Sequence, residues 1–143
     1  MNKVKIIKHR HDFETPRPET SGAVGYDVRS NGTHIVPAGG MKLVPLGVSV
    51  EVPKGYALQL LPRSSLFGKT GLVVGNSIGL IDQDYRGEIM LCLWNPQEQD
   101  VEVIDGERIA QLVFVRIDMP ELVATDVLSP SSRDKGGFGS TNI

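Results

Sequence analysis

The sequence predicts an all-β domain, and three observations support this fold class. Short runs rich in β-branched residues recur along the chain, separated by Gly, Pro, Asn and Asp. Sixteen glycines and nine prolines indicate frequent turns. Apolar residues at helical spacing are hard to find, and residues 64–69 are expected to form one helical turn at most. Many short, closely spaced strands are typical of an antiparallel sandwich, jelly roll or barrel rather than of an alternating α/β fold.

The expected strands follow one another through most of the chain. In order they are 4–8, 25–29, 33–36, 41–52, 56–62, 72–74, 77–81, 88–94, 101–104, 110–116 and 121–124. In segment 101–104, apolar and polar residues begin to alternate, as in a half-buried strand. After Leu128 the chain becomes polar and Gly-rich, with Phe138 as its single aromatic residue. We therefore expect a β-rich domain over residues 1–128 and a mobile C-terminal tail over 129–143.

Composition limits the classes of function. A chain of 143 residues fits one domain with a modest core. The formal net charge of -2 argues against a broad nucleic-acid groove, although a small phosphate pocket remains possible. The single cysteine, Cys92, lies in an apolar run and is expected to be buried, which fits a reducing cytoplasm. The charged N-terminus resembles no signal peptide, and no apolar run has membrane-spanning length, so we expect a soluble intracellular protein.

The segment RSSLFGKT, residues 63–70, ends like a Walker A phosphate loop. Such a loop needs Gly at position 63, and it needs a helix directly after Gly-Lys-Thr. Position 63 is arginine, and residues 71–75 are expected to be extended, so the P-loop interpretation fails. The residue types still suit phosphate, because Arg63 offers a planar fork of donors and Ser64 and Ser65 add hydroxyl groups. A solvated loop containing an arginine is the alternative.

The stretch NSIGLIDQDYRGE, residues 76–88, concentrates acidic residues at an expected turn. We predict a β-hairpin whose tip carries Asp82, Asp84, Tyr85 and Arg86. An ionised aspartate can accept a proton from an attacking water, whereas two carboxylates could also serve glycoside hydrolysis. The three histidines lack zinc-ligand spacing. Any metal is expected to be a hard cation such as Mg²⁺, held mainly by substrate oxygens.

Five stretches of the sequence, in this order, resemble the motifs of the trimeric dUTP pyrophosphatase (dUTPase) family. They are residues 25–28, 62–66, 76–88, 106–112 and 133–141. The resemblance spans nearly the whole chain. It implies a jelly-roll-like subunit with a flexible Gly-rich tail, in a homotrimer with active sites between subunits. It also implies hydrolysis of dUTP to dUMP and pyrophosphate with Mg²⁺ on the triphosphate, which limits uracil incorporation into DNA and supplies dUMP.

The same resemblance implies roles for individual residues. Asp82 matches the carboxylate that activates the attacking water, and Tyr85 matches the aromatic residue that packs under the deoxyribose. Asp27 matches the acidic residue near the metal's waters. The positions matching uracil recognition are Asn76 and the main chain of Leu80, Ile81 and Met90. The positions matching phosphate contacts are Arg63, Ser64, Ser65 and Gln111.

The tail residues match a lid that closes over the substrate. Arg133 and Ser140 match the γ-phosphate clamp, Gly139 matches a further substrate contact, and Phe138 matches the ring that covers the base. Glycines let main-chain amides approach oxyanions, and an aromatic ring can stack on a base. A segment that orders only over bound substrate can be both mobile and functional.

Some positions depart from the family pattern, and two rival functions stay open. Asp134 stands where the family often has glycine, Phe67 where a small residue is common, and residues 142–143 replace a final glycine. A dCTP deaminase shares the fold and an Arg-Ser-Ser stretch, and a nucleotide-sensing regulator could bind dUTP without turnover. If the chain acts on dUTP, we expect its site to reject cytosine because the amino group of cytosine would face another hydrogen-bond donor. We expect it to reject thymine because the site leaves little space near the 5-position of the base. The expected partners are dUTP and other copies of the chain, without nucleic acid or membrane, in the cytoplasm or, for a viral protein, the host cytoplasm or nucleus.

Overall fold

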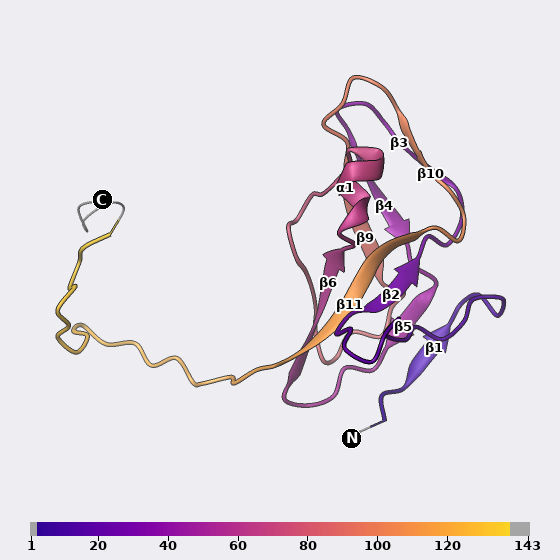
Figure 1. Cartoon of the computed structure of the whole chain (residues 1–143). Coiled ribbons are helices and arrows are strands. Elements are labelled where there is room, and N and C mark those ends of the chain that lie inside the picture. Colours follow the sequence, from indigo (N-terminus) through magenta and orange to yellow (C-terminus); the bar gives the residue numbers. More distant parts are fainter. Residues whose placement is uncertain (1–2, 138–143) are drawn as a thin grey trace.

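The computed structural model describes residues 3–137 of the chain, and the regular secondary structure of this part is almost entirely antiparallel strand (Figure 1). The all-β prediction is therefore confirmed. The strands are β1 (Ile6–Lys8), β2 (Tyr26–Arg29), β3 (His34–Val36), β4 (Met41–Pro45), β5 (Val48–Val50), β6 (Tyr56–Pro62), β7 (Val73–Val74), β8 (Gly79–Ile81), β9 (Met90–Trp94), β10 (Val101–Val103) and β11 (Arg108–Arg116). The helix α1 (Ser65–Thr70) follows β6 directly.

Four antiparallel sheets form the body. The largest has the strand order β2-β11-β6-β8, and the second has the order β4-β9-β7. Two further ladders pair β1 with β5 and β10 with β3. The longest pairing joins β6 to β11, from Pro62 opposite Ala110 to Tyr56 opposite Arg116. This ladder holds β6 and β11 in fixed register, with the predicted site residue Arg63 directly after β6 and Gln111 within β11.

The core lies where inward-facing side chains of these sheets meet. Along β9, Leu91 and Leu93 are buried while the intervening residues face outward, as the two-residue period of a strand requires. One continuous apolar cluster contains the fully buried side chains of both large sheets, including Val28, Val44, Leu58, Leu60, Leu91, Leu93 and Leu112. Cys92 lies on the outward-facing side of β9, so it is half-buried and the expectation of a fully buried thiol is wrong.

Two elements differ in length from their predictions. The expected strand 41–52 is two strands, because Gly47 has a φ of 69°, a left-handed conformation that interrupts the extended backbone between β4 and β5. The helix α1 has six residues, which is about 1.7 turns rather than one turn. It ends at Gly71, whose φ is also 69° and whose N–H donates to the carbonyl of Phe67.

The predicted hairpin around residues 82–87 is wrong. Strand β8 pairs with β6, whereas β9 pairs with β4 and β7, so the segment between them crosses from one sheet to another. Ile89 explains the crossing, because its side chain is buried in the core and its N–H donates to the carbonyl of Val48. The acidic residues therefore lie on a crossover loop instead of a hairpin tip.

The expected strand 121–124 does not form in this chain. Residues 117–137 leave the body after β11 without helix or strand (Figure 1). Leu122 is 93% exposed and Val123 is 76% exposed. A strand needs a neighbouring strand to satisfy its main-chain groups, and this segment lies beside none within residues 3–137. No helix of the described residues is long and apolar enough to cross a bilayer.

Candidate functional site

A cluster of charged groups surrounds Asp27 on strand β2. The carboxyl oxygen Oδ2 of Asp27 lies 3.0 Å from Arg63 Nε and 3.6 Å from Arg108 Nη1. Arg108 also pairs with Glu19. The Asp27 side chain is only 13% exposed, and its Oδ2 has no well-aligned hydrogen bond within residues 3–137. Two guanidinium groups thus lie beside one largely buried carboxylate that can still accept a hydrogen bond.

This cluster lines a hollow of about 360 Å³ that brings together residues of three sequence motifs. Asp27 comes from β2, Arg63 and Ser64 follow β6, and Gln111 comes from β11. Gln111 Nε2 donates to the carbonyl of Pro62 at 3.1 Å. A Cβ at Gly25 would overlap Oε1 of Gln111 and lie 3.0 Å from its Cδ, so only glycine fits this wall without displacing the amide.

The serines beside Arg63 belong to the start of α1. Ser64 occupies the N-cap position, yet its side chain makes no capping hydrogen bond. Ser65 is the first helical residue and does not line the hollow. Arg63 itself is fixed to β11 through its N–H, which donates to the carbonyl of Ile109 at 3.3 Å. The second and fourth motifs are therefore held together by the β6–β11 ladder.

Asp82 lies in a second hollow, of about 590 Å³, directly after β8. The lining includes Leu80, Ile81, Asp82 and Asp84, together with Tyr56 and Met119 from other parts of the chain. Asp82 is exposed, and no ion pair or hydrogen bond engages its carboxylate among the described residues. Its main-chain carbonyl accepts a hydrogen bond from the N–H of Tyr85 at 3.3 Å. The carboxylate is thus open to solvent and unengaged among the described residues.

Residues expected to contact the base and sugar lie around the crossover loop. The Leu80 side chain is 62% exposed, although β8 is paired with β6 along one edge. Because β8 is the last strand of its sheet, its other edge has no strand partner within residues 3–137. Met90 begins β9, and Asn76 lies in the turn before β8, where its carbonyl accepts the N–H of Ile78. Tyr85 is partly exposed, and its hydroxyl donates to the carbonyl of Glu88 at 2.9 Å.

The two hollows are far apart within one chain. Asp82 follows Ile81, which pairs with Leu58, so position 82 is level with Ala57 at the start of β6. Arg63 comes six positions further along, just beyond the other end of this strand. At about 3.3 Å per residue, the separation is roughly 20 Å. Among the residues that the structure describes, the two hollows have no lining residue in common.

The tail places Arg133 away from both hollows. Arg133 Nε donates to the carbonyl of Gly136 at 2.8 Å, and the N–H of Gly136 donates to the carbonyl of Arg133. Asp134 has a φ of 44°, a conformation that glycine adopts without strain and that aspartate tolerates better than most residues. The predicted residues Phe138, Gly139 and Ser140 lie outside the described residues, as do positions 142 and 143.

Sequence reasoning missed Arg108 and Glu19 as members of the site. Arg108 lies inside the quoted fourth motif, so its position in that motif was the available signal. Glu19 lies in a polar N-terminal stretch that carries no motif, and only its contact with Arg108 identifies it.

The donor set fits an outer-sphere metal better than a protein-held one. No group of three or more His, Cys, Asp or Glu residues within the described part could hold a metal ion. Asp27 offers one buried oxygen without a hydrogen-bond donor, but two guanidinium groups lie beside it. A carboxylate in this setting suits a donor such as metal-bound water more than direct coordination.

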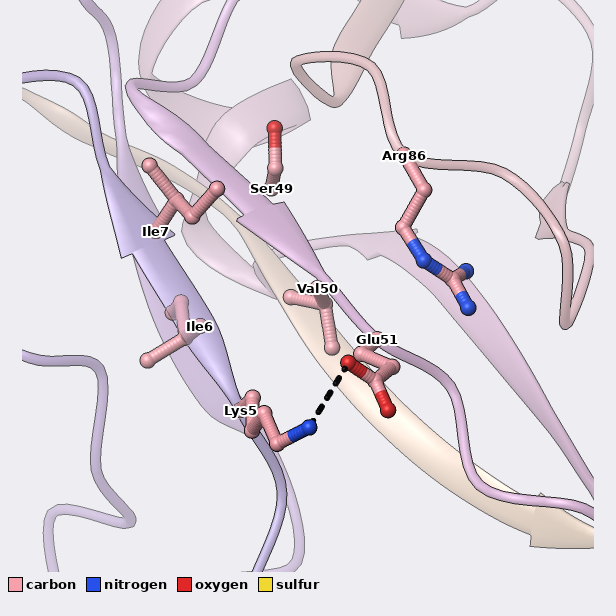
Figure 2. Close-up of a pocket in the computed structure, with 7 residues that line it drawn as sticks. All are labelled: Lys5, Ile6, Ile7, Ser49, Val50, Glu51 and Arg86. Carbon is pink, nitrogen blue, oxygen red and sulfur yellow. Dashed lines mark hydrogen bonds and ion pairs between the residues drawn. The ribbon is translucent and has the colours of Figure 1, made fainter.

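A third hollow, of about 170 Å³, lies along β1 and β5 (Figure 2). Its lining is largely aliphatic, with Ile6, Ile7 and Val50, and Lys5 pairs with Glu51 at its rim at 3.4 Å. Arg86 of the crossover loop also borders this hollow. Within residues 3–137, none of the residues predicted to bind substrate lines it.

Comparison with known proteins identifies the family of this β-sheet protein. The family model for dUTPase matches residues 11–142. The deoxyuridine 5'-triphosphate nucleotidohydrolase of Neorickettsia sennetsu is 39% identical over 141 residues, covering 97% of this chain and 95% of that protein. The protein of the same name from Thermoanaerobacter is 38% identical, covering 99% and 97%. The chain belongs to the dUTPase family.

A solved structure gives the same assignment at the level of the fold. The dUTPase of Staphylococcus bacteriophage 80alpha, solved with dUPNHPP, superposes with a TM-score of 0.91 over 100% of both chains. Its sequence is 27% identical to this one. The work on that structure describes phage dUTPases as controlling transfer of virulence genes. The resemblance drawn from the five motifs is therefore confirmed.

Proposed function

We propose that this chain hydrolyses dUTP to dUMP and pyrophosphate, with Asp82 as the general base. The observation that carries the proposal is the exposed, unengaged carboxylate of Asp82 in a member of the dUTPase family. A water oxygen attacks the α-phosphorus while its proton passes to the Asp82 carboxylate. The bond from the α-phosphorus to the oxygen bridging to the β-phosphorus breaks, and pyrophosphate leaves with that electron pair.

The charged hollow binds the triphosphate in this proposal. Arg63 and Gln111 line it, the Ser64 and Ser65 hydroxyls lie at the start of α1, and Arg63 provides the planar fork that suits phosphate oxygens. Asp27 would accept hydrogen bonds from water molecules on a divalent cation, for which we propose Mg²⁺. When bound, Mg²⁺ neutralises charge on the phosphate oxygens. Because Arg63 pairs with Asp27 in this structure, phosphate binding exchanges one anionic partner of Arg63 for another.

Uracil and deoxyribose are recognised beside the crossover loop. Asn76 and the main chain of Leu80, Ile81 and Met90 read the edge of uracil, and the unpaired edge of β8 supports a main-chain contact. Cytosine would place an amino group against a donor, and such unpaired polar groups give strong discrimination. Thymine is excluded by lack of space for its methyl group. The ring of Tyr85 packs under the sugar and leaves no room for a 2′-hydroxyl.

The separation of the hollows supports a homotrimer whose active sites lie between subunits. One phosphate cannot contact Arg63 and Asp82 of a single chain when about 20 Å separates them. Apolar residues on the outer face of β4 and β9 support contact with another copy, since Met41 lies opposite Trp94 and both are about half exposed. The exposed apolar side chains of segment 117–128 support the same conclusion.

We further propose that residues 1–128 form the catalytic domain and that the tail 129–143 closes over the substrate. In this arrangement Arg133 and Ser140 bind the γ-phosphate, Gly139 adds a contact, and Phe138 covers the base. Such a lid excludes water other than the nucleophile. We place the reaction in the cytoplasm, because the single cysteine is compatible with a reducing compartment.

A pyrophosphate-release assay tests the proposal. Purified protein is given dUTP, dCTP, dTTP or UTP, each with and without Mg²⁺, and we expect Mg²⁺-stimulated release from dUTP alone. Asp82→Asn should lower kcat by about 10²–10⁴-fold with little change in nucleotide binding. Glu102→Gln is the matched control, because Glu102 is exposed on β10 and lines neither hollow.

Other outcomes of the assay identify the rival functions. Ammonia release from dCTP would indicate a deaminase, and tight dUTP binding without turnover would indicate a nucleotide sensor. Unchanged turnover in Asp82→Asn would refute the role of Asp82 even if dUTP is the substrate.

A further inference from the structure

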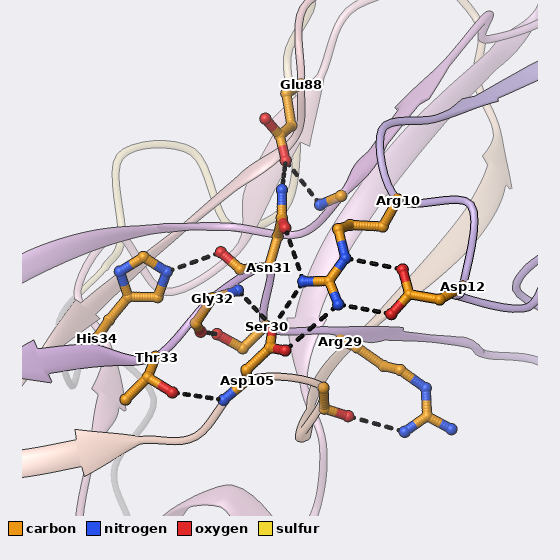
Figure 3. A network of polar contacts seen from close by, with 12 residues as sticks. Arg10, Asp12, Arg29, Ser30, Asn31, Gly32, Thr33, His34, Glu88 and Asp105 are labelled. Atoms are coloured by element: carbon orange, nitrogen blue, oxygen red, sulfur yellow. Dashed lines mark hydrogen bonds and ion pairs between the residues drawn. The ribbon is translucent and has the colours of Figure 1, made fainter.

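Glu88 joins the end of the crossover loop to two other loops of the chain. Its carboxylate oxygen Oε1 accepts hydrogen bonds from Asn31 Nδ2 at 2.9 Å and from the N–H of Gly47 at 2.8 Å (Figure 3). Gly47 is the residue whose left-handed conformation interrupts the extended backbone between β4 and β5. Asn31 lies between β2 and β3. One half-buried carboxylate therefore fixes the loop that begins at Asp82.

The partner Asn31 is itself held by a charged network. Asn31 Oδ1 accepts a hydrogen bond from Arg10 Nη1 at 3.5 Å (Figure 3). Arg10 pairs with Asp12 at 2.6 Å and with Asp105 at 2.9 Å, and Asp105 also accepts the N–H of Gly32 at 2.7 Å. Hydrogen bonding to Arg10 lowers the pKa of Asp12 to about 2. The network is thus fully charged at neutral pH, and Asn31 is a fixed anchor.

Glu88 also contacts Tyr85 through its main chain. The hydroxyl of Tyr85 donates to the carbonyl of Glu88 at 2.9 Å. Gly87 lies between them, and a Cβ there would overlap the Tyr85 hydroxyl and lie 2.7 Å from Cζ of the ring. Movement of the Glu88 main chain would therefore move the acceptor that orients the Tyr85 ring.

We infer that Glu88 is a positioning residue for sugar selectivity: its carboxylate, held by Asn31 and Gly47, sets the place of the Tyr85 ring. The inference rests on the proposed function, in which this ring excludes a ribonucleotide. Releasing the carboxylate lets the loop end shift, so the ring moves away and a 2′-hydroxyl fits. Selectivity for dUTP over UTP then falls, although Glu88 touches no substrate.

Two substitutions at position 88 separate positioning from charge. Glu88→Ala removes the carboxylate that accepts hydrogen bonds from Asn31 and Gly47. We expect the ratio of kcat/KM for dUTP to that for UTP to fall at least about tenfold, since hydrogen bonds to charged groups are the stronger class. Glu88→Gln keeps an oxygen that accepts both N–H donors, so the ratio should stay within about threefold of the wild-type value. Glu102→Ala, at an exposed position on β10, is the control and should leave the ratio unchanged.

The ratio distinguishes positioning from a loss of folded enzyme. Fewer folded molecules would lower turnover of both nucleotides equally and leave their ratio unchanged. If Glu88→Ala does not fold, Asn31→Ala and Gly87→Ala carry the test. Asn31→Ala removes one of the two donors, and Gly87→Ala displaces the Tyr85 ring directly. A wild-type ratio in all folded variants that lack these contacts would overturn the inference.

Amide hydrogen exchange gives a readout that does not depend on the proposed function. The N–H groups of Tyr85 and Ile89 are hydrogen-bonded to the carbonyls of Asp82 and Val48. Exchange of these amides should be faster in Glu88→Ala and unchanged in Glu88→Gln and Glu102→Ala. Failure of wild-type protein to hydrolyse dUTP would refute the proposed function alone. Unchanged exchange in Glu88→Ala would refute the inference whatever the activity.

Discussion

Mixing two inactive variants tests whether one active site takes residues from different subunits. Arg63→Ala removes the guanidinium from the charged hollow, and Asp82→Asn removes the proposed base from the other hollow. Each variant alone should be nearly inactive. These positions lie about 20 Å apart along β6 in one chain, so a shared site must take them from two copies.

Simple counting gives the size of the effect. In trimers assembled from equal amounts of both variants, each site takes Arg63 from one copy and Asp82 from another. Each copy supplies the intact residue with even odds, so about a quarter of the sites are complete. Pyrophosphate release should therefore reach about a quarter of the wild-type rate after the variants are unfolded together and refolded. Mixing without subunit exchange is the control.

The mixture should behave differently if each active site is formed within one chain. If each chain formed its own site, every site in the mixture would lack one residue, and the mixture would stay as inactive as its parts. Native mass spectrometry of the same sample shows whether mixed trimers formed. A mixture that contains mixed trimers yet releases no pyrophosphate would refute the shared site.

Three further predictions follow from local contacts. Gly25→Ala should raise KM for dUTP, because its Cβ displaces the Gln111 amide, whereas Gly68→Ala, with nothing within 4 Å, should leave steady-state kinetics unchanged. The pKa of Asp12 is lowered in the folded protein by its hydrogen bond to Arg10. The ionised Asp12 carboxylate therefore stabilises the folded state above pH 4, and this stabilisation is lost as the pH falls toward about 2. The Tm difference between wild type and Arg10→Ala should therefore shrink over that interval, and a constant difference would contradict it. If the negative charge of Asp134 opposes phosphate binding, Asp134→Gly and Asp134→Asn should both lower KM for dUTP. If the positive φ of Asp134 weakens binding instead, only Asp134→Gly should lower it.

The fold could be predicted well because it depends on local patterns. Strand β6 has the predicted bounds, and β2, β10 and β11 lie within two residues of theirs, since turn residues stand close to the ends of these short runs. The interruption at Gly47 was missed because residues 41–52 are rich in strand-forming residues throughout, and left-handed backbone is not marked by hydrophobicity. The crossover after β8 was missed because turn residues look alike whether the next strand pairs with the last or joins another sheet.

The sequence predicts the candidate site as a set of residues, but it does not give their arrangement. Spacing along the chain does not show that Gly25 leaves room for Gln111, because these residues meet only when β2 and β11 pair. It also does not show that Asp82 and Arg63 stand at opposite ends of β6, which follows from register alone. Segment 121–124 illustrates the same limit: its composition suits a strand, yet within the described residues of one chain nothing lies beside it. A strand-forming segment without a strand partner in one chain, and a proposed base remote from the proposed phosphate site, are both explained if the functional unit contains more than one copy.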